Sequence, residues 1–216
     1  MTNYLKSIEK KLSNKKNIIF DLDGVLIDSL KNMETSWSLT NKKFSLNISF
    51  DKYCEYIGKP FKEILKSLGV KKIFFSLVEK EFRKKSLKNL HKIKFYPSTY
   101  RVLRYLKRKN YFLGILTSKD KLRTKKILKK LNIKFDTIQC PETNYKGKPH
   151  PDLIKKIIKN HNLKKLECVY IGDTIYDKQM CQKAKVDFIF AEYGFRIGIK
   201  NYKYKIKKFL DIKKIF

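Results

Sequence analysis

Residues 17–29 read NIIFDLDGVLIDS, and the interpretation of the whole chain begins from this stretch. An apolar run over residues 18–20 leads directly into two aspartates one residue apart, followed by a glycine. Asp21 and Asp23 have the two-residue spacing that directs side chains to one side of an extended chain. Carboxylates packed this closely raise one pKa unless a cation intervenes. The pair therefore fits a proton-sharing nucleophile and acid, half of a divalent metal site, or the turn that Asp-Gly signals.

Further along the chain, short apolar runs alternate with amphipathic, lysine-rich segments. We expect strands at NIIF (17–20), FLGILT (112–117), TIQ (137–139), CVYI (168–171) and FIF (188–190). These runs lack polar alternation, as strands covered by helices on both faces do. We expect the intervening helices to begin near Pro97, at an N-cap formed by Ser118, and at Pro151. This rhythm predicts an α/β fold built on a doubly wound parallel sheet.

Residues 30–94 interrupt the rhythm, because they contain helical patterns and no convincing strand. A segment of about 65 residues is too long for a single crossover connection. We therefore predict an inserted α-helical domain over 30–94, lying above the strand ends where such sheets bind ligands. Residues 1–29 and 95–216 would form the α/β core. Asp28 and Ser29 are expected to cap the first helix of the insert.

The composition excludes several classes of protein. A chain of 216 residues with 42% hydrophobic residues can bury a full core. No apolar run approaches the ~18 residues that a membrane span requires. The polar, lysine-rich residues 1–16 do not resemble a secretory signal, so a cytoplasmic location is expected. The four cysteines are scattered and have neither metal-ligand nor disulfide spacing.

The net charge is strongly positive, with 52 Lys+Arg against 20 Asp+Glu and a formal charge of +32. Such a field attracts polyanions and steers small anionic substrates toward the protein. The lysines are spread over the whole chain, however, and no known nucleic-acid-binding module is recognisable. We therefore expect no dedicated nucleic-acid partner and no membrane partner.

Three more clusters of polar residues lie beside the predicted elements. VYIGDTIYD ends a strand with Asp173 and adds Asp177, which suits Mg²⁺ but also fits an N-cap and a solvated carboxylate. Thr117 and Ser118 follow another strand and could form an anion cradle or an ordinary helix cap. Lys148 lies in KGKPHP, whose glycine and proline neighbours fix the backbone around it. Since parallel strand ends converge on one edge, all four clusters together predict one active site.

In this order the clusters resemble the motifs of the haloacid dehalogenase-like (HAD) hydrolase superfamily, in its phosphoglycolate phosphatase-like branch. FDLDGVLIDS resembles the first motif, LTS the second, KPHP the lysine motif and IGDTIYD the fourth. The likeness extends over nearly the whole chain, and the helical insert resembles the cap domain of the family. Within the insert, YIGKPFKEIL resembles a substrate-specificity loop, in which Gly58 would supply a bend and Lys59 would meet an anionic substrate.

The resemblance implies a Mg²⁺-dependent phosphatase that acts through an aspartyl-phosphate. Asp21 would be the nucleophile, and Asp23 would protonate the leaving oxygen and then deprotonate the attacking water. Mg²⁺ would be held by Asp21, the main-chain carbonyl of Asp23 and Asp173. Asp177 would bind the metal either directly or through water.

The resemblance also implies the phosphate-binding residues and the substrate class. Thr117, the Ser118 N–H and Gly24 would contact the phosphate, and Lys148 would neutralise the charge shared by nucleophile and phosphate. The substrate would be a small phosphorylated metabolite of the phosphoglycolate or sugar-phosphate type.

Two alternatives stay open. A β-phosphoglucomutase-like phosphosugar mutase shares the DGV form of the first motif, although such mutases usually have histidine where this chain has Met33. Trp37 is reminiscent of that branch, but we expect it to pack inside the insert. The second alternative is a non-catalytic polyanion-binding protein. Asp23 argues against dehalogenases and phosphonate-cleaving relatives, which lack this second aspartate.

Overall fold

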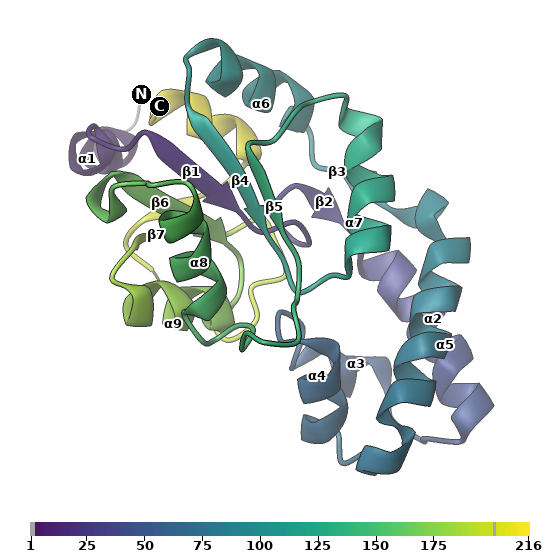
Figure 1. Cartoon of the computed structure of the whole chain (residues 1–216). Helices are drawn as coiled ribbons and strands as arrows, with labels where there is room; N and C mark the ends of the chain where they lie inside the picture. The colour runs from purple at the N-terminus through teal and green to yellow at the C-terminus, as the bar shows by residue number, and fades with distance from the viewer. Residues whose placement is uncertain (1–2, 201) are drawn as a thin grey trace.

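A six-stranded sheet forms the centre of the computed structural model, which describes residues 3–200 and 202–216 (Figure 1). The strand order is β5-β4-β1-β6-β7-β8, and every neighbouring pair is parallel. The strands are β1 (Asn17–Phe20), β4 (Phe112–Leu116), β5 (Thr137–Gln139), β6 (Cys168–Gly172), β7 (Asp187–Ala191) and β8 (Lys205–Ile206). The doubly wound parallel sheet expected from the sequence is confirmed, with β8 as an addition.

Helices cover both faces of the sheet, and β1 shows why its residues are apolar without alternation. Ile18 and Phe20 enter one hydrophobic cluster, whereas Ile19 enters the other. The first cluster is closed by α1 (Asn3–Leu12), α6 (Thr99–Arg108), α7 (Lys121–Leu128), η3 (Lys129–Leu131) and η5 (Phe209–Lys214). The second is closed by α8 (Asp152–Asn160) and α9 (Ile175–Ala184), with η4 (Lys165–Glu167) before β6. A central strand buried on both faces is typical of this fold.

The helical insert, residues 30–94, lies to one side of the sheet (Figure 1). It consists of α2 (Leu30–Phe44), α3 (Phe50–Cys54), α4 (Phe61–Ser67), η1 (Lys72–Phe74), α5 (Phe75–Lys88) and η2 (Leu90–Lys92). Leu90 of η2 packs against the first cluster of the sheet, whereas helices α2, α3, α4 and α5 share a hydrophobic cluster of their own. Trp37 is buried there as expected, stacked on Tyr53 with ring centroids 4.8 Å apart. Its indole N–H donates to the Ile48 carbonyl at 3.0 Å.

Two short strands join the insert to the sheet. β2 (Ile27–Asp28) pairs antiparallel with β3 (Lys94–Phe95), so the chain enters and leaves the insert at adjacent points. Strand β3 begins at Lys94, which is the last residue of the stretch 30–94 in which no strand was expected. The Asp28 carboxylate accepts from the Leu30 N–H at 3.1 Å, as expected of a capping residue. Ser29 occupies the N-cap position of α2 but makes no capping hydrogen bond.

Two predicted helix starts require correction. The helix expected to be capped by Ser118 begins at Lys121, and its N-cap is Asp120, whose carboxylate accepts from the Arg123 N–H at 3.1 Å. Aspartate is among the strongest N-cap residues, and here it fixes the cap two positions beyond the serine. Helix α6 begins at Thr99, two residues beyond Pro97.

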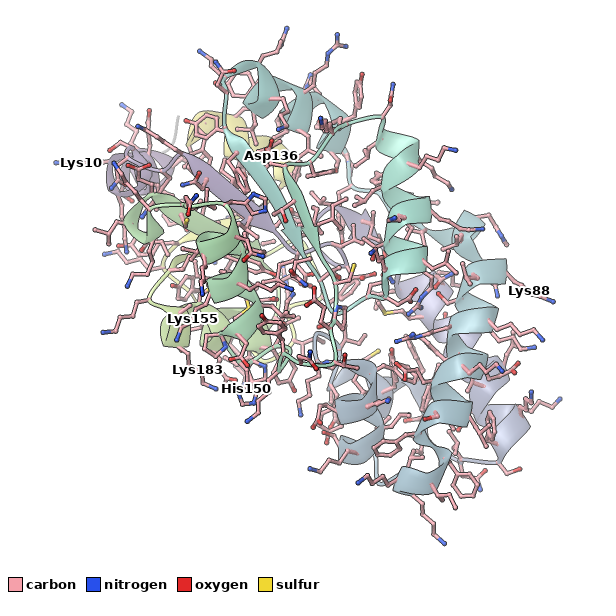
Figure 2. The ribbon with its side chains drawn as sticks, viewed as in Figure 1. Lys10, Lys88, Asp136, His150, Lys155 and Lys183 are labelled. Atoms are coloured by element: carbon pink, nitrogen blue, oxygen red, sulfur yellow. The ribbon has the colours of Figure 1, made fainter. Side chains whose placement is uncertain are left out.

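The positive charge is distributed over the outside of the protein. Figure 2 shows Lys10, Lys88, Lys155 and Lys183 directed outward from α1, α5, α8 and α9. This spread over four separate elements is that of a generally basic surface. Among the described helices, none is both long enough and apolar enough to span a membrane.

Candidate active site

The central strands bring the predicted motifs to one edge of the sheet. Asp21 follows β1, Thr117 follows β4 and Asp173 follows β6. Strand β1 lies between the other two, with Phe20 in register with Ile115 on one side and with Ile171 on the other. The three residues therefore leave neighbouring strands at the same carboxyl edge, where parallel sheets form their sites.

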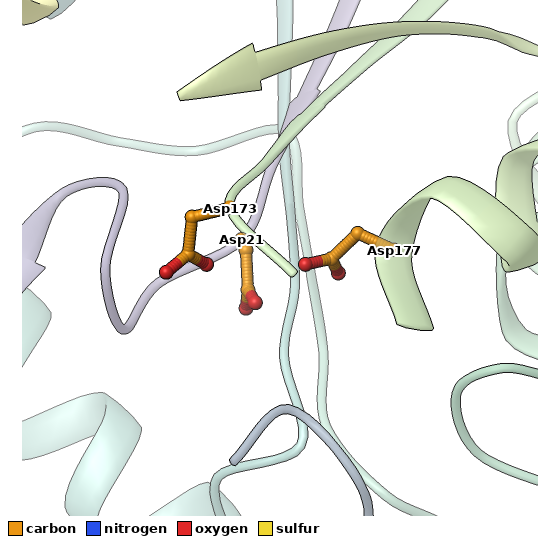
Figure 3. A group of neighbouring side chains, drawn as sticks. All are labelled: Asp21, Asp173 and Asp177. Atoms are coloured by element: carbon orange, nitrogen blue, oxygen red, sulfur yellow. The ribbon is translucent and has the colours of Figure 1, made fainter. Parts of the chain in front are cut away.

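A buried cluster of three carboxylates lies at this edge. Asp21, Asp173 and Asp177 each offer one oxygen, and these atoms lie within 4.8 Å of one another (Figure 3). The ammonium group of Lys148 is 2.7 Å from Oδ2 of Asp21 and 2.8 Å from Oδ1 of Asp177. The structure therefore brings together the first motif, the lysine motif and the fourth motif.

The charges in this cluster are unbalanced. Burial raises the pKa of Asp21 to about 7, although the positive charge of Lys148 opposes the shift. Burial, with Asp177 and Asp21 adding to it, also raises the pKa of Asp173 well above its ordinary value. Burial alone would lower the pKa of Lys148, but Asp177 and Asp21 outweigh it and raise that pKa. One lysine therefore faces three carboxylates, an arrangement that a further cation would stabilise.

The oxygens of Asp173 show where such a cation fits. Oδ2 accepts a hydrogen bond from the Phe195 N–H at 2.7 Å. Oδ1 is buried and has no hydrogen-bond partner among the described residues. A buried, unpartnered carboxylate oxygen beside two more carboxylates is a donor set that suits Mg²⁺. The residues present therefore fit the metal that the sequence implied.

Asp177 is engaged differently from the other two aspartates. Its Oδ2 accepts from the N–H of Thr174 at 3.0 Å and from the Thr174 hydroxyl at 2.7 Å. Its Oδ1 lies 2.8 Å from Lys148 and 3.2 Å from the Tyr170 hydroxyl. A direct metal bond would displace one of these donors, so the contacts are those of a residue that fixes Lys148 in place.

Glycines allow the backbone to approach the acidic cluster closely. A Cβ at Gly24, which has φ +76°, would lie 2.0 Å from Oδ2 of Asp173. A Cβ at Gly194 would lie 2.6 Å from Cβ of Asp173. Gly24 thus packs against a carboxylate of the cluster, a contact that the sequence did not predict.

The second motif lies beside this cluster and also touches the insert. Thr117 is buried, and its hydroxyl accepts from the Lys119 N–H at 3.1 Å. The Ser118 hydroxyl donates to the carbonyl of Gly58 in the insert at 2.7 Å. Gly58 has φ +106°, which confirms the predicted bend. Ser118 therefore links the sheet to the insert rather than capping a helix.

Two buried cations on the sheet side of the site, Lys119 and Arg123, were not predicted from the sequence. Lys119 Nζ lies 3.0 Å from Oδ1 of Asp23. Arg123 pairs with Asp120, and its guanidinium carbon lies 5.5 Å from the ring centroid of Phe82 in the insert. Their residue types gave no signal in a chain this rich in lysine and arginine. The only available clue was the position of Lys119 directly after the second motif.

A cavity of about 60 Å³ lies between the sheet edge and the insert. The sheet side supplies the polar wall, which consists of Asp21, Asp23, Thr117, Ser118, Lys119, Arg123, Asp173 and Thr174. The insert supplies a mostly apolar wall, which consists of Met33, Tyr53, Ile57, Gly58, Lys59, Phe61, Ile64 and Phe82. Lys59, which was expected to meet substrate, is the one ammonium group that the described insert contributes to this wall.

The fold and the site together define a hydrolase of the HAD type, and the chain belongs to the haloacid dehalogenase-like hydrolase family, whose model matches residues 18–191. It is similar to the phosphoglycolate phosphatase of Aquifex aeolicus, with 31% identity over 82% of this chain and 85% of the relative. It is also similar to the pyrophosphatase PpaX of Oceanobacillus iheyensis, with 25% identity over 79% of this chain and 80% of the relative. These matches confirm the resemblance inferred from the motifs.

A solved haloacid dehalogenase-like hydrolase from Streptococcus pneumoniae has the same fold. Its TM-score to this chain is 0.79 at 23% identity, covering 93% of this chain and 98% of the solved one. The likeness therefore includes the sheet and the helical insert together.

Proposed function

We propose that this protein is a Mg²⁺-dependent phosphatase that hydrolyses a small phosphorylated metabolite through an aspartyl-phosphate on Asp21. The observation that carries the proposal is the buried cluster of three carboxylates, two of which contact Lys148, with one oxygen of Asp173 unpartnered among the described residues. The activities named for the two curated relatives, both phosphate-releasing, support the reaction class.

The polar wall, together with the buried Lys148 beside it, supplies the groups that phosphoryl transfer needs. Asp21 attacks phosphorus, while Thr117, the Ser118 N–H and Lys148 hold the phosphate oxygens and offset their charge. Asp21, the main-chain carbonyl of Asp23 and Asp173 would hold Mg²⁺, which when bound reduces the repulsion between the nucleophile and the phosphate. Because Gly24 has no side chain, its backbone can lie directly against the carboxylate of Asp173.

Asp177 acts on the site through Lys148. Thr174 holds Oδ2 of Asp177, and Oδ1 contacts the lysine ammonium, which lies between Asp177 and the nucleophile. Of the two alternatives for Asp177, this arrangement favours contact with the metal through water. Asp23 serves as acid toward the leaving oxygen and then as base toward water.

The helical insert acts as a cap domain over residues 30–94, with residues 1–29 and 95–216 as the catalytic core. Its contact with Ser118 and its apolar wall support this role, because closure over the phosphate excludes bulk water. The four free cysteines are compatible with a reducing cytoplasm.

A single assay series tests the proposal. Phosphate release is measured from a panel of phosphorylated metabolites and from p-nitrophenyl phosphate, with Mg²⁺ and with excess chelator. We expect metal-dependent release that Asp21→Asn removes. A phosphosugar mutase would interconvert isomers without net phosphate release, and a polyanion-binding protein would show no turnover. Either result, or full activity in chelator, would overturn the proposal.

A further inference from the structure

The residue before the first helix of the insert does not perform its usual task. A serine at an N-cap normally accepts a hydrogen bond from a main-chain N–H of the first turn. Ser29 makes no such bond, and the Leu30 N–H is bonded by Asp28 instead. The Ser29 hydroxyl, which is 0% exposed, donates to Oδ1 of Asp23 at 2.5 Å. The Ser29 side chain thus makes its hydrogen bond to an active-site carboxylate and not to the helix backbone.

Lys119 is directed at the same atom. Its ammonium lies 3.0 Å from Oδ1 of Asp23, and its side chain is only 3% exposed. A buried ammonium has lost its hydration and therefore depends on its carboxylate partner. Within residues 3–200 and 202–216, no donor is bonded to Oδ2 of Asp23. Two donors thus hold one oxygen and leave the other free.

We propose that Lys119 and Ser29 are positioning residues that fix Oδ1 of Asp23, so that Oδ2 alone exchanges the catalytic proton. This inference rests on the proposed function. In the first step Oδ2–H gives its proton to the leaving oxygen while the bond from phosphorus to that oxygen breaks and the bond to Asp21 forms. In the second step water attacks phosphorus, its proton passes to Oδ2, and the bond to Asp21 breaks.

The position of Ser29 also connects the proton-transfer group to the insert. Ser29 lies between β2 and α2, where the chain enters the insert. A shift of α2 relative to the sheet therefore moves one of the two donors of Asp23. The orientation of Oδ2 is set only when the insert occupies the position seen in this structure.

Two aryl phosphates of nearly equal shape test the assignment. p-Nitrophenyl phosphate needs little protonation of its leaving oxygen, whereas phenyl phosphate needs it strongly. Rapid-mixing measurements on Lys119→Met and Ser29→Ala separate the transfer to Asp21 from the later hydrolysis. We expect transfer from phenyl phosphate to fall by about 10²-fold. Transfer from p-nitrophenyl phosphate should fall far less, and hydrolysis should slow for both esters, so that aspartyl-phosphate accumulates.

Matched variants distinguish positioning from a general loss of structure. Ser36→Ala removes a fully buried hydroxyl within α2, and Lys15→Met removes another buried lysine that is paired with an aspartate, Asp187. Neither should change the ratio of the two transfer rates. Equal loss on both esters in Lys119→Met and Ser29→Ala, or no loss, overturns the inference. If Lys119→Met does not fold, Ser29→Ala decides alone.

The outcome is separable from that of the proposed function. A wild-type protein without phosphatase activity, or one whose activity survives Asp21→Asn, contradicts the proposed function itself. A wild-type protein that passes those tests while both positioning variants keep the wild-type ratio contradicts only the assignment of Lys119 and Ser29.

Discussion

The two walls of the cavity are built in different ways. On the sheet side, Asp21, Thr117 and Asp173 each follow a strand of one parallel sheet, and ion pairs and hydrogen bonds fix several of the groups around them. On the insert side, the wall is largely apolar, and Lys59 is the one ammonium group among its described residues. Rigid strand ends can hold reacting groups to a fraction of an ångström, whereas an apolar wall excludes water and selects by shape. Under the proposed function, the sheet would carry the chemistry and the insert would be the place where substrates are distinguished.

The largest expected effect comes from the nucleophile. Asp21→Asn keeps the shape of the side chain but removes the attacking charge, so turnover should fall by about 10⁴-fold or more, measured as phosphate release. The pKa of Asp21, raised to about 7 by burial, also predicts a stability effect in chelator. Between about pH 4 and about pH 7 the unfolded wild type releases a proton that the folded state retains, so wild-type stability falls as pH rises.

The Asp21→Asn variant has no carboxyl group to titrate at this position, so it does not lose this stability as the pH rises. Its melting temperature relative to wild type should therefore increase from pH 4 to pH 7 and stay level above, as followed by circular dichroism. Near-normal turnover of Asp21→Asn would remove the basis for placing the chemistry on the sheet side.

The second effect concerns the metal. Asp173→Ala deletes the unpartnered oxygen, and the Mg²⁺ concentration needed for half-maximal activity should rise by about tenfold or more. Mg²⁺ should also raise the melting temperature of wild type, because it binds the folded state, and should do so much less in the variant. Equal thermal shifts in the two proteins would show that Asp173 is not a ligand.

The third effect tests the close approach of backbone to the acidic cluster. Gly24→Ala places a methyl group 2.0 Å from Oδ2 of Asp173 at φ +76°. Gly69 has the same φ of +76°, and a Cβ added there would meet no described atom within 4 Å, so Gly69→Ala is a control for backbone strain alone. Each change should cost about 1–3 kcal/mol of unfolding free energy from strain. Only Gly24→Ala should in addition weaken Mg²⁺ binding, and equal metal affinity in both variants would contradict this role.

The smallest effect is expected on the insert side. Lys59→Ala should raise KM for anionic metabolites several-fold and leave kcat nearly unchanged, because it removes a contact made equally before and during the reaction. The exposed Lys62 in the same stretch provides the matched control, Lys62→Ala, which should leave both constants unchanged. A fall in kcat on Lys59→Ala would mean that the insert takes part in the chemistry.

The sheet and its strand-end residues were predictable from the sequence because both signals are local. An apolar run followed at once by Asp, Thr or Gly-Asp identifies a strand and the group it presents. Strands β2 and β8 were not predictable, since a two-residue strand is too short for any periodicity.

The positions that failed are those that depend on tertiary contacts. Ser118 was interpreted as a helix cap, but its hydroxyl donates a hydrogen bond to the distant Gly58 carbonyl and Asp120 caps the helix. Lys119 and Arg123 belong to a chain with 52 Lys+Arg residues, in which only burial marks them. Ser29 was correctly placed at the helix start, but the sequence could not show that its hydroxyl is bonded to Asp23.

The pairing of β2 with β3 has an evolutionary consequence. Because Ile27 lies opposite Phe95, the two ends of the insert are held side by side on the core. A segment with adjacent ends can be lengthened, shortened or exchanged without rerouting the chain through the sheet, and the entropic cost of a longer loop grows only slowly with its length. If the insert selects the substrate as proposed, replacement of this one contiguous stretch would change the substrate range without altering the residues at the strand ends.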